Sequence, residues 1–182
     1  MENKDFFMER LMNSLDQQTF KNFEVIVTED GKMAENTNSA IKKATGDIIK
    51  LLYMDDYLYD KDALKHIYLS FTGGWLASGC IHDDGNSLTN PHFPKWSQNV
   101  KNGVNTIGSP SVVAFANDKP LLFNENLSWM LDVELYGRLF ERYGEPTVIN
   151  YIDVGIGLHP GQTTHLMSDE EKQREVEYVA SL

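Results

Sequence analysis

The sequence predicts an α/β domain in which helices flank a mixed, mainly parallel sheet. Helix-like and strand-like segments alternate over the first 70 residues, which is the pattern of α/β layering. Residues 23–28 (FEVIVT) form a compact β-branched run, as found in parallel strands that are buried on both faces. The chain of 182 residues contains no linker, repeat or low-complexity tract, so we expect one domain spanning 1–182.

Hydrophobic spacing justifies the elements in chain order. Residues 5–18 are predicted to be helical because Phe7, Leu11 and Leu15 recur at a spacing of four. Ser168 and Glu171 form a capping box, which predicts a last helix extending to about Leu182. The other predicted elements are helices over residues 36–44, 60–71 and 130–143, and strands over residues 23–28, 48–53, 75–81, 112–115 and 147–152.

Composition excludes several classes of protein. Lys and Arg number 16 against 27 Asp and Glu, a net charge of −11, which disfavours binding to nucleic acid. No apolar run approaches the roughly 20 residues of a membrane span, and the N-terminus has no apolar signal core. The single cysteine, Cys80, cannot form an internal disulfide and is expected to be a small buried hydrophobe. We therefore expect a cytoplasmic protein without a membrane span.

Two acidic pairs follow two of the predicted strands. Glu29 and Asp30 follow the first, where carboxylates can accept hydrogen bonds from a base or ribose. Asp55 and Asp56 follow the second, where a divalent cation would offset their mutual repulsion. The alternative for each pair is an ordinary acidic turn, with Gly31 supplying the turn geometry in the first case.

Two further residues are candidates for chemistry. Asp132 lies at the start of a predicted helix, where it is either favoured by the helix dipole or acts as a general base beside a cleft. Glu134 and Arg138 are four residues apart and can pair on one face of that helix. No histidine shows zinc-ligand spacing, but His159 is retained as a candidate.

The order and spacing of several motifs resemble family 2 glycosyltransferases of the GT-A fold. The first two stretches are FMERLMNSLDQQTFKNFEVIVTEDG and NSAIKKATGDIIKLLYMDDYL. They resemble the family's helix with Gln-Thr and Asn-Phe-Glu, its strand ending in Asp-Asp-Gly-Ser, and its strand ending in an Asp-x-Asp-type motif. Downstream, ENLSWMLDVELYGRLFERYGEP and VGIGLHPGQTT resemble the family's Glu-Asp-x-Glu-Leu-x-x-Arg helix and its His-x-x-Gln-x-Thr segment.

The resemblance implies a Rossmann-like GT-A fold and an inverting, metal-assisted sugar transfer. The donor would be a nucleotide-diphosphate sugar, and the acceptor a hydroxyl of a saccharide or another molecule. Residues of about 1–72 would bind the donor, and residues of about 73–182 would supply the acceptor side and the base. The implied roles are nucleotide binding for Glu29, Asp30, Asn38 and Asp55, binding of Mn²⁺ or Mg²⁺ for Asp55, Asp56 and His159, and general base for Asp132.

The chain departs from the family in three places. Tyr53 stands where the family has the first Asp of Asp-Ala-Asp-Asp, and Leu131 stands where the residue before the base is often Glu. The family begins with a buried strand ahead of the first helix, whereas this chain starts at that helix. An open sheet edge or gap is therefore expected, with homodimerisation, partial instability or a loss of nucleotide affinity as consequences.

Three other functions compete with the transferase. A non-catalytic domain that binds nucleotide or sugar weakly is favoured by Tyr53 and the absent strand. A nucleotidyltransferase would need a basic, glycine-rich loop, which the region of Gly31 and Lys32 does not provide. A glycosidase also uses two carboxylates, but adjacent ones at a strand end suit a metal better.

Overall fold

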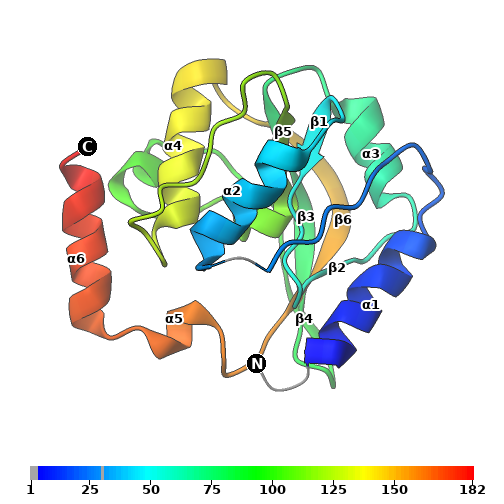
Figure 1. The fold of residues 1–182 in the computed structure, drawn as a ribbon, viewed down its shortest axis with the longest axis horizontal. Coiled ribbons are helices and arrows are strands. Elements are labelled where there is room, and N and C mark those ends of the chain that lie inside the picture. Colours follow the sequence, from blue (N-terminus) through cyan, green and yellow to red (C-terminus); the bar gives the residue numbers. More distant parts are fainter. Residues whose placement is uncertain (1–3, 30) are drawn as a thin grey trace.

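The computed structural model describes residues 4–29 and 31–182 and contains a mixed sheet with helices on both faces (Figure 1). The helices are α1 (Lys4–Asp16), α2 (Met33–Lys43), α3 (Ala63–Ser70), α4 (Leu131–Tyr143), α5 (Thr163–Leu166) and α6 (Asp169–Ala180), with 3-10 turns η1 (Gln98–Asn102) and η2 (Pro110–Val112). The strands are β1 (Ile48–Lys50), β2 (Tyr57–Leu58), β3 (Trp75–Asp83), β4 (Leu88–His92), β5 (Val113–Ala116) and β6 (Thr147–Gly157).

The strand order is β1-β5-β3-β6-β2, with β4 also paired to β3. The β3–β6 pair is parallel, and its ladder runs from Leu76 opposite Thr147 to Asp83 opposite Gly157. The other described pairs are antiparallel. The predicted mixed α/β sheet is therefore confirmed, but its parallel share is smaller than expected.

Alternating side chains on the strands build a core on each face of the sheet. Trp75, Ala77 and Phe115 point to the face covered by α2 and α4. Leu76 and Ala114 point to the opposite face, which α1 and α3 cover. The result is three layers, with β3 at the centre, because its buried residues serve both cores.

Residues 23–28 differ most from their prediction. They form no strand of the sheet, and Phe23, Val25 and Val27 are 37%, 45% and 54% exposed. Among the described residues, no backbone hydrogen bond joins this segment to a strand. The β-branched composition is that of a buried strand, but among the described strands β1 pairs with β5 and not with this segment.

Most other elements lie where they were predicted. The last helix is capped by the reciprocal hydrogen bonds of Ser168 and Glu171, and Cys80 is buried at 2% exposure. The segment 73–110 contains β4 and η1, which the sequence did not predict. No helix in the described part of the chain is both long and apolar enough to cross a membrane.

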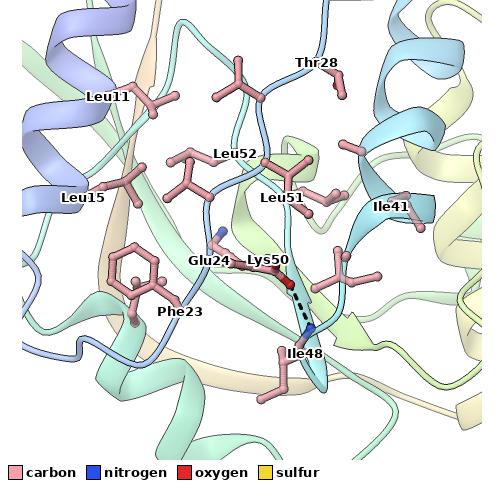
Figure 2. A pocket seen from close by; sticks show the side chains of 18 of the residues that line it. Leu11, Leu15, Phe23, Glu24, Thr28, Ile41, Ile48, Lys50, Leu51 and Leu52 are labelled. Carbon is pink, nitrogen blue, oxygen red and sulfur yellow. Dashed lines mark hydrogen bonds between the residues drawn. The ribbon is translucent and has the colours of Figure 1, made fainter.

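A cavity of about 910 Å³ lies between residues 23–28 and β1 (Figure 2). Leu11 and Leu15 of α1 line it on one side, and Ile41 of α2 lines it on the other. Residues 51–53, which follow β1, also contribute to its wall. The walls of this cavity are mainly apolar.

Candidate active site

The acidic turn after β1 is held by the neighbouring 3-10 turn. The Tyr53 N–H donates to Ser111 Oγ at 2.9 Å, and the Asp56 N–H closes the turn on Tyr53 O at 2.9 Å. This arrangement fixes the backbone of residues 53–56 at the end of the sheet where β6 also finishes. The two adjacent aspartates then point in different directions.

Asp55 is the outward-facing member of the pair. Its Oδ2 lies 3.2 Å from Nε2 of His159, which follows β6, and the carboxylate is 20% exposed. The His159 ring also packs against Phe7 of α1, with centroids 5.3 Å apart. Residues predicted as ligands 104 positions apart in the chain are therefore side by side.

Asp56 is the inward-facing member, with 2% exposure. Its Oδ1 accepts the Gly157 N–H at 3.1 Å, and its Oδ2 accepts the Ser109 hydroxyl at 3.3 Å. Burial, followed by the neighbouring Asp55 carboxylate, raises the pKa of Asp56. Asp56 thus connects the acidic turn to β6 and to the segment before β5, while Asp55 remains available to a ligand.

Glycine is required at position 157 for this connection. A Cβ there would collide with the backbone carbonyl oxygen of Asp55 and would lie against the Arg10 guanidinium. The close approach of β6 to the acidic turn therefore needs a residue without a side chain.

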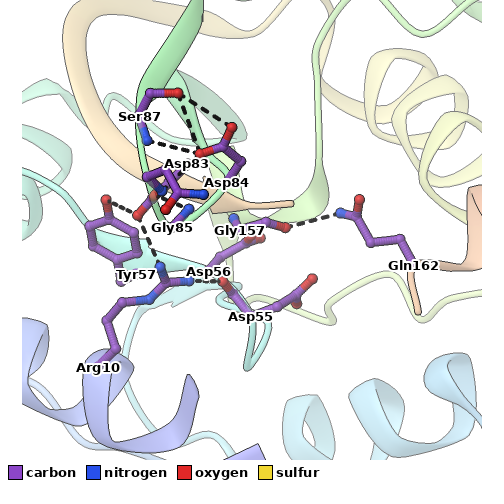
Figure 3. A network of polar contacts seen from close by, with 11 residues as sticks. Arg10, Asp55, Asp56, Tyr57, Asp83, Asp84, Gly85, Ser87, Gly157 and Gln162 are labelled. Atoms are coloured by element: carbon purple, nitrogen blue, oxygen red, sulfur yellow. Dashed lines mark hydrogen bonds and ion pairs between the residues drawn. The ribbon is translucent and has the colours of Figure 1, made fainter. Parts of the chain in front are cut away.

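Arg10 of α1 supports the same turn from the other side (Figure 3). Its guanidinium donates to the Asp55 carbonyl oxygen at 2.5 Å and to Asp83 Oδ2 at 3.0 Å. The guanidinium also lies 4.4 Å from the ring centre of Tyr57, whose hydroxyl donates to the same Asp83 oxygen at 3.0 Å. Arg10 thus joins α1, the acidic turn and the end of β3.

Asp132 lies in the first turn of α4. Its Oδ1 accepts the Val133 N–H at 2.7 Å, and its Oδ2 accepts the side-chain amide of Asn105 at 2.7 Å. Burial raises the pKa of Asp132 to about 7, against the lowering effect of these hydrogen bonds. A carboxylate with this pKa can both accept and release a proton near neutral pH.

The pKa of Tyr53, the first residue of the acidic turn, is affected by Asp132. Burial raises the pKa of Tyr53, and the charges of Asp132, Asp56 and Asp55 add to the shift. Thr37 of α2 donates to the Tyr53 hydroxyl at 3.5 Å. Asn105, which donates to Asp132, also donates to Gly108 O at 3.0 Å, and the next residue, Ser109, donates to Asp56. Residues 105–109 therefore join Asp132 to the acidic turn.

The remaining predicted nucleotide contacts have different surroundings. Glu29 is exposed and pairs with Lys4 at 2.7 Å, while Asp30 lies outside the described residues. Asn38 is buried, and its amide joins α2 to the backbone of Phe123 at 2.7 and 2.9 Å and to Glu125 at 2.9 Å. The Asn38 amide therefore holds α2 against residues 123–125 rather than facing the acidic turn.

A divalent cation fits this region only in part. Asp55 and His159 present an oxygen and a nitrogen donor to one place, but Asp56 uses both its oxygens inside the protein. In residues 4–29 and 31–182, no group of three or more metal-binding side chains is assembled. Any cation bound here would take its other ligands from a substrate and from water.

Three residues that the sequence did not single out organise the site. Arg10 supports Asp55, Asn105 holds Asp132, and the Glu175 carboxylate of α6 accepts the N–H groups of residues 128–130 at 2.8 Å each. Glu175 thereby docks α6 against the start of α4. No local sequence signal marks these contacts because each joins residues that are distant in the chain.

Comparison with solved structures identifies the architecture. The structure of S. aureus TarS 1–349 in complex with UDP superposes with a TM-score of 0.69 at 18% identity, over 97% of this chain and 61% of TarS 1–349. The same fragment in complex with UDP-GlcNAc gives a TM-score of 0.69 at 17% identity, over 98% of this chain and 63% of the fragment. TarS is a GT-A-type glycosyltransferase. This chain has a GT-A-like fold.

The likeness is one of fold alone. The GT-A-like chain spans less than two thirds of the TarS fragments that it matches, and 40% of the longer TarS structure, for which the TM-score is 0.65. The sequence matches no known family model. It matches no curated protein sequence either.

Proposed function

We propose that this chain is a glycosyltransferase domain that transfers a sugar from a nucleotide-diphosphate sugar to an acceptor hydroxyl with inversion. The observation that carries the proposal is that, in a GT-A-like fold, residues 105–109 join Asp132 to the acidic turn: Asn105 donates to Asp132 and to Gly108 O, and Ser109 donates to Asp56. The complexes of TarS with UDP and UDP-GlcNAc support a uridine nucleotide as the first donor to try.

In the proposed reaction, Asp132 is the general base, and Asp55 and His159 are the metal-binding residues. Asp132, when deprotonated, takes the proton of the acceptor hydroxyl as its oxygen attacks the anomeric carbon and the bond to the diphosphate breaks. Asn105 and the Val133 N–H keep the Asp132 carboxylate oriented. Asp55 and His159 would hold Mn²⁺ or Mg²⁺, which would neutralise charge on the diphosphate. Attack from the opposite face of the sugar gives inversion.

A non-catalytic nucleotide-binding domain is the second candidate. Two of the residues expected to bind metal or nucleotide already form hydrogen bonds within the protein, which favours this candidate. Both Asp56 oxygens accept such bonds, and the Asn38 amide bonds to the backbone of Phe123. Such a domain would bind a nucleotide through Asp55 without turning over a sugar donor.

A thermal-shift titration tests donor binding. We would titrate UDP and GDP, with and without Mn²⁺, against wild type, Asp55→Ala and Asp118→Ala. Asp118 is an exposed carboxylate on the loop after β5, at the opposite end of β1 from the acidic turn. A ligand at about 100 times its Kd stabilises the folded state by roughly 2.7 kcal/mol. We expect a Mn²⁺-dependent shift with UDP that Asp55→Ala abolishes and Asp118→Ala retains.

Hydrolysis of UDP-GlcNAc, or its transfer to an added acceptor, then separates the two candidates. Turnover that depends on Asp132 supports the transferase. A metal-dependent UDP shift without turnover of any sugar donor supports the binding domain. The absence of a shift with either nucleotide would contradict both.

A further inference from the structure

The side-chain amide of Asn105 has all four of its hydrogen-bonding positions filled. Its Oδ1 accepts the Ile107 and Gly108 N–H groups at 3.0 and 2.8 Å. Its Nδ2 donates to Gly108 O at 3.0 Å and to Asp132 Oδ2 at 2.7 Å. An amide has two acceptor and two donor positions, and turning this one over would bring its NH₂ group against two N–H donors. The nitrogen, and not the oxygen, therefore faces Asp132.

The segment that carries this amide is fixed to its surroundings. Ile107 is fully buried, at 0% exposure. The Lys95 N–H donates to Thr106 O at 3.0 Å, and the Thr106 hydroxyl donates to Lys95 O at 2.6 Å. Contacts of this kind hold a polar side chain in one direction, so the Asn105 amide is a fixed donor beside the carboxyl group.

The two ends of the Asn105 amide make contacts of different kinds. The Oδ1 bonds form an Asx turn, a common local motif that Asp also makes and that Ser makes more weakly. The Nδ2 bond to Asp132 is not part of that turn and joins residues 27 positions apart. Because an N–H group can only donate, this bond stabilises the ionised form of Asp132 more than the neutral form.

The ionised form of Asp132 is the form that can accept a proton. Burial raises the pKa of Asp132 to about 7, and the bond from Asn105 opposes this rise. A carboxyl group with that pKa is roughly half ionised at neutral pH, and a pKa higher by one would leave roughly a tenth of it ionised. Loss of the Asn105 donor would therefore remove most of the base at neutral pH.

Two tyrosines are the titratable groups, among the described residues, whose pKa the Asp132 charge affects. Burial raises the pKa of both Tyr53 and Tyr136 above the ordinary value, so both hydroxyls are neutral near pH 7. The Tyr136 hydroxyl donates to Gly108 O at 3.0 Å rather than to Asp132. Titratable side chains of the adjoining elements bond elsewhere, namely His92 of β4 with Ile107 O and Glu134 of α4 with Arg138. In the described part of the chain, Asn105 is thus the side chain that donates to the Asp132 carboxylate.

We propose that Asn105 is a positioning residue for the base: its locked amide keeps Asp132 ionised and fixed in direction, so that Asp132 can take the proton of an acceptor hydroxyl. The inference rests on the proposed function for the identity of that proton. The effect of Asn105 on Asp132 itself belongs to the folded chain and needs no substrate. A role confined to the Asx turn would leave the proton affinity of Asp132 unchanged whenever the turn is kept.

Two variants separate the turn from the donor. Asn105→Asp can still accept both N–H groups of the turn, but it presents an oxygen to Asp132. Asn105→Ser keeps a weaker turn, adds no charge and is too short to reach Asp132. Since two adjacent carboxyl groups titrate as a pair, the Ser variant gives the comparison without that coupling.

Asn124→Asp is the matched control. Asn124 Oδ1 also accepts an N–H two residues on, from Asn126 at 3.1 Å, and its Nδ2 donates to the Tyr178 hydroxyl at 3.3 Å rather than to Asp132. The substitution therefore makes the same change in charge, in a similar turn, without removing a donor to the base.

Carbon NMR of the side-chain carboxyl groups follows the titration of Asp132 in the full chain without nucleotide. The resonance is assigned by its loss in Asp132→Asn. We expect the titration midpoint of Asp132 to rise by about one pH unit or more in Asn105→Asp, where a like charge replaces a donor. We expect a smaller rise in Asn105→Ser and an unchanged midpoint in Asn124→Asp.

The pH dependence of UDP-GlcNAc hydrolysis or transfer gives the second measurement. The rising limb of kcat should move to higher pH in both Asn105 variants, with the KM of the donor little changed. For a midpoint raised by one pH unit, kcat at pH 7 should fall about fivefold and should largely return at about pH 9. A purely structural role would lower kcat by the same factor at every pH.

An unchanged Asp132 midpoint in both Asn105 variants would overturn the proposal, whether or not any donor is turned over. A kcat that falls equally at every pH would overturn it as well. A raised midpoint in a chain whose wild type turns over no sugar donor would contradict the proposed function, while it would support the assignment of Asn105 to the ionised form of Asp132.

Discussion

Burial raises the pKa of Asp132, and hydrogen bonds from the Val133 N–H, from its own N–H and from the Asn105 amide oppose this rise. Asp132→Asn keeps the shape of the side chain and removes the base. We expect a loss of transfer of about 10²- to 10⁴-fold, the usual contribution of general base catalysis. The thermal shift with UDP should persist, because Asp132 is assigned to the acceptor hydroxyl. Retention of full transfer activity would contradict that assignment.

The same pKa makes folding stability depend on pH. The pKa of Asp132 is about 7 in the folded chain, against 3.8 for an ordinary aspartate, so the folded chain binds the proton more tightly. Its stabilising effect is therefore complete below about pH 4 and is lost as the pH rises toward and through 7. We expect the free energy of unfolding in urea to fall over this range, by at most about 1.4 kcal/mol per pH unit from one group.

A comparison of wild type with Asp132→Asn isolates this contribution. Because Asn does not titrate, the fall in unfolding free energy between pH 5 and 7 should be shallower in the variant. The burial of Asp56 leaves part of the slope in both proteins. Parallel pH profiles for the two proteins would show that Asp132 titrates normally when folded.

Arg10 tests how the acidic turn is supported. Arg10→Gln removes the ion pair with Asp83 and the bond to the Asp55 carbonyl. Since hydrogen bonds to charged groups contribute about 1.5–3 kcal/mol each and two are removed, we expect the unfolding free energy to fall by about 3 kcal/mol or more, with a smaller UDP shift. Arg142→Gln is the matched control, because Arg142 is exposed and donates to Lys119 O at 2.7 Å. An equal loss of unfolding free energy in Arg10→Gln and Arg142→Gln would show that Arg10 contributes no more to stability than an exposed arginine.

At the scale of elements, the Glu175 carboxylate joins α6 to the residues just before α4. Glu175 accepts three N–H groups before α4, and α6 itself has no fully buried residue. Glu175→Gln weakens this cap, and cap substitutions typically cost about 1 kcal/mol. We expect faster amide exchange in α6 and in residues 128–134, measured by mass spectrometry. Glu177→Gln, an exposed neighbour on α6, should leave exchange in residues 128–134 unchanged.

Element prediction from sequence succeeded where local signals agreed with tertiary contacts. The spacing of Phe7, Leu11 and Leu15 predicted α1 because all three pack into the domain. The prediction of a strand at residues 23–28 was wrong for the converse reason. β-branched composition indicates a preference for strand pairing, but a strand also needs a neighbouring strand, which local composition cannot reveal. The same limit hid Arg10 and Glu175, whose partners are 45 or more residues away.

At the scale of the whole molecule, the cavity and the candidate active site share their walls. Glu29 directly follows residues 23–28, and residues 51–54 run from the cavity into the acidic turn with Asp55. A change in the packing of this shared wall would therefore act on the backbone that positions the Asp55 carboxylate beside His159.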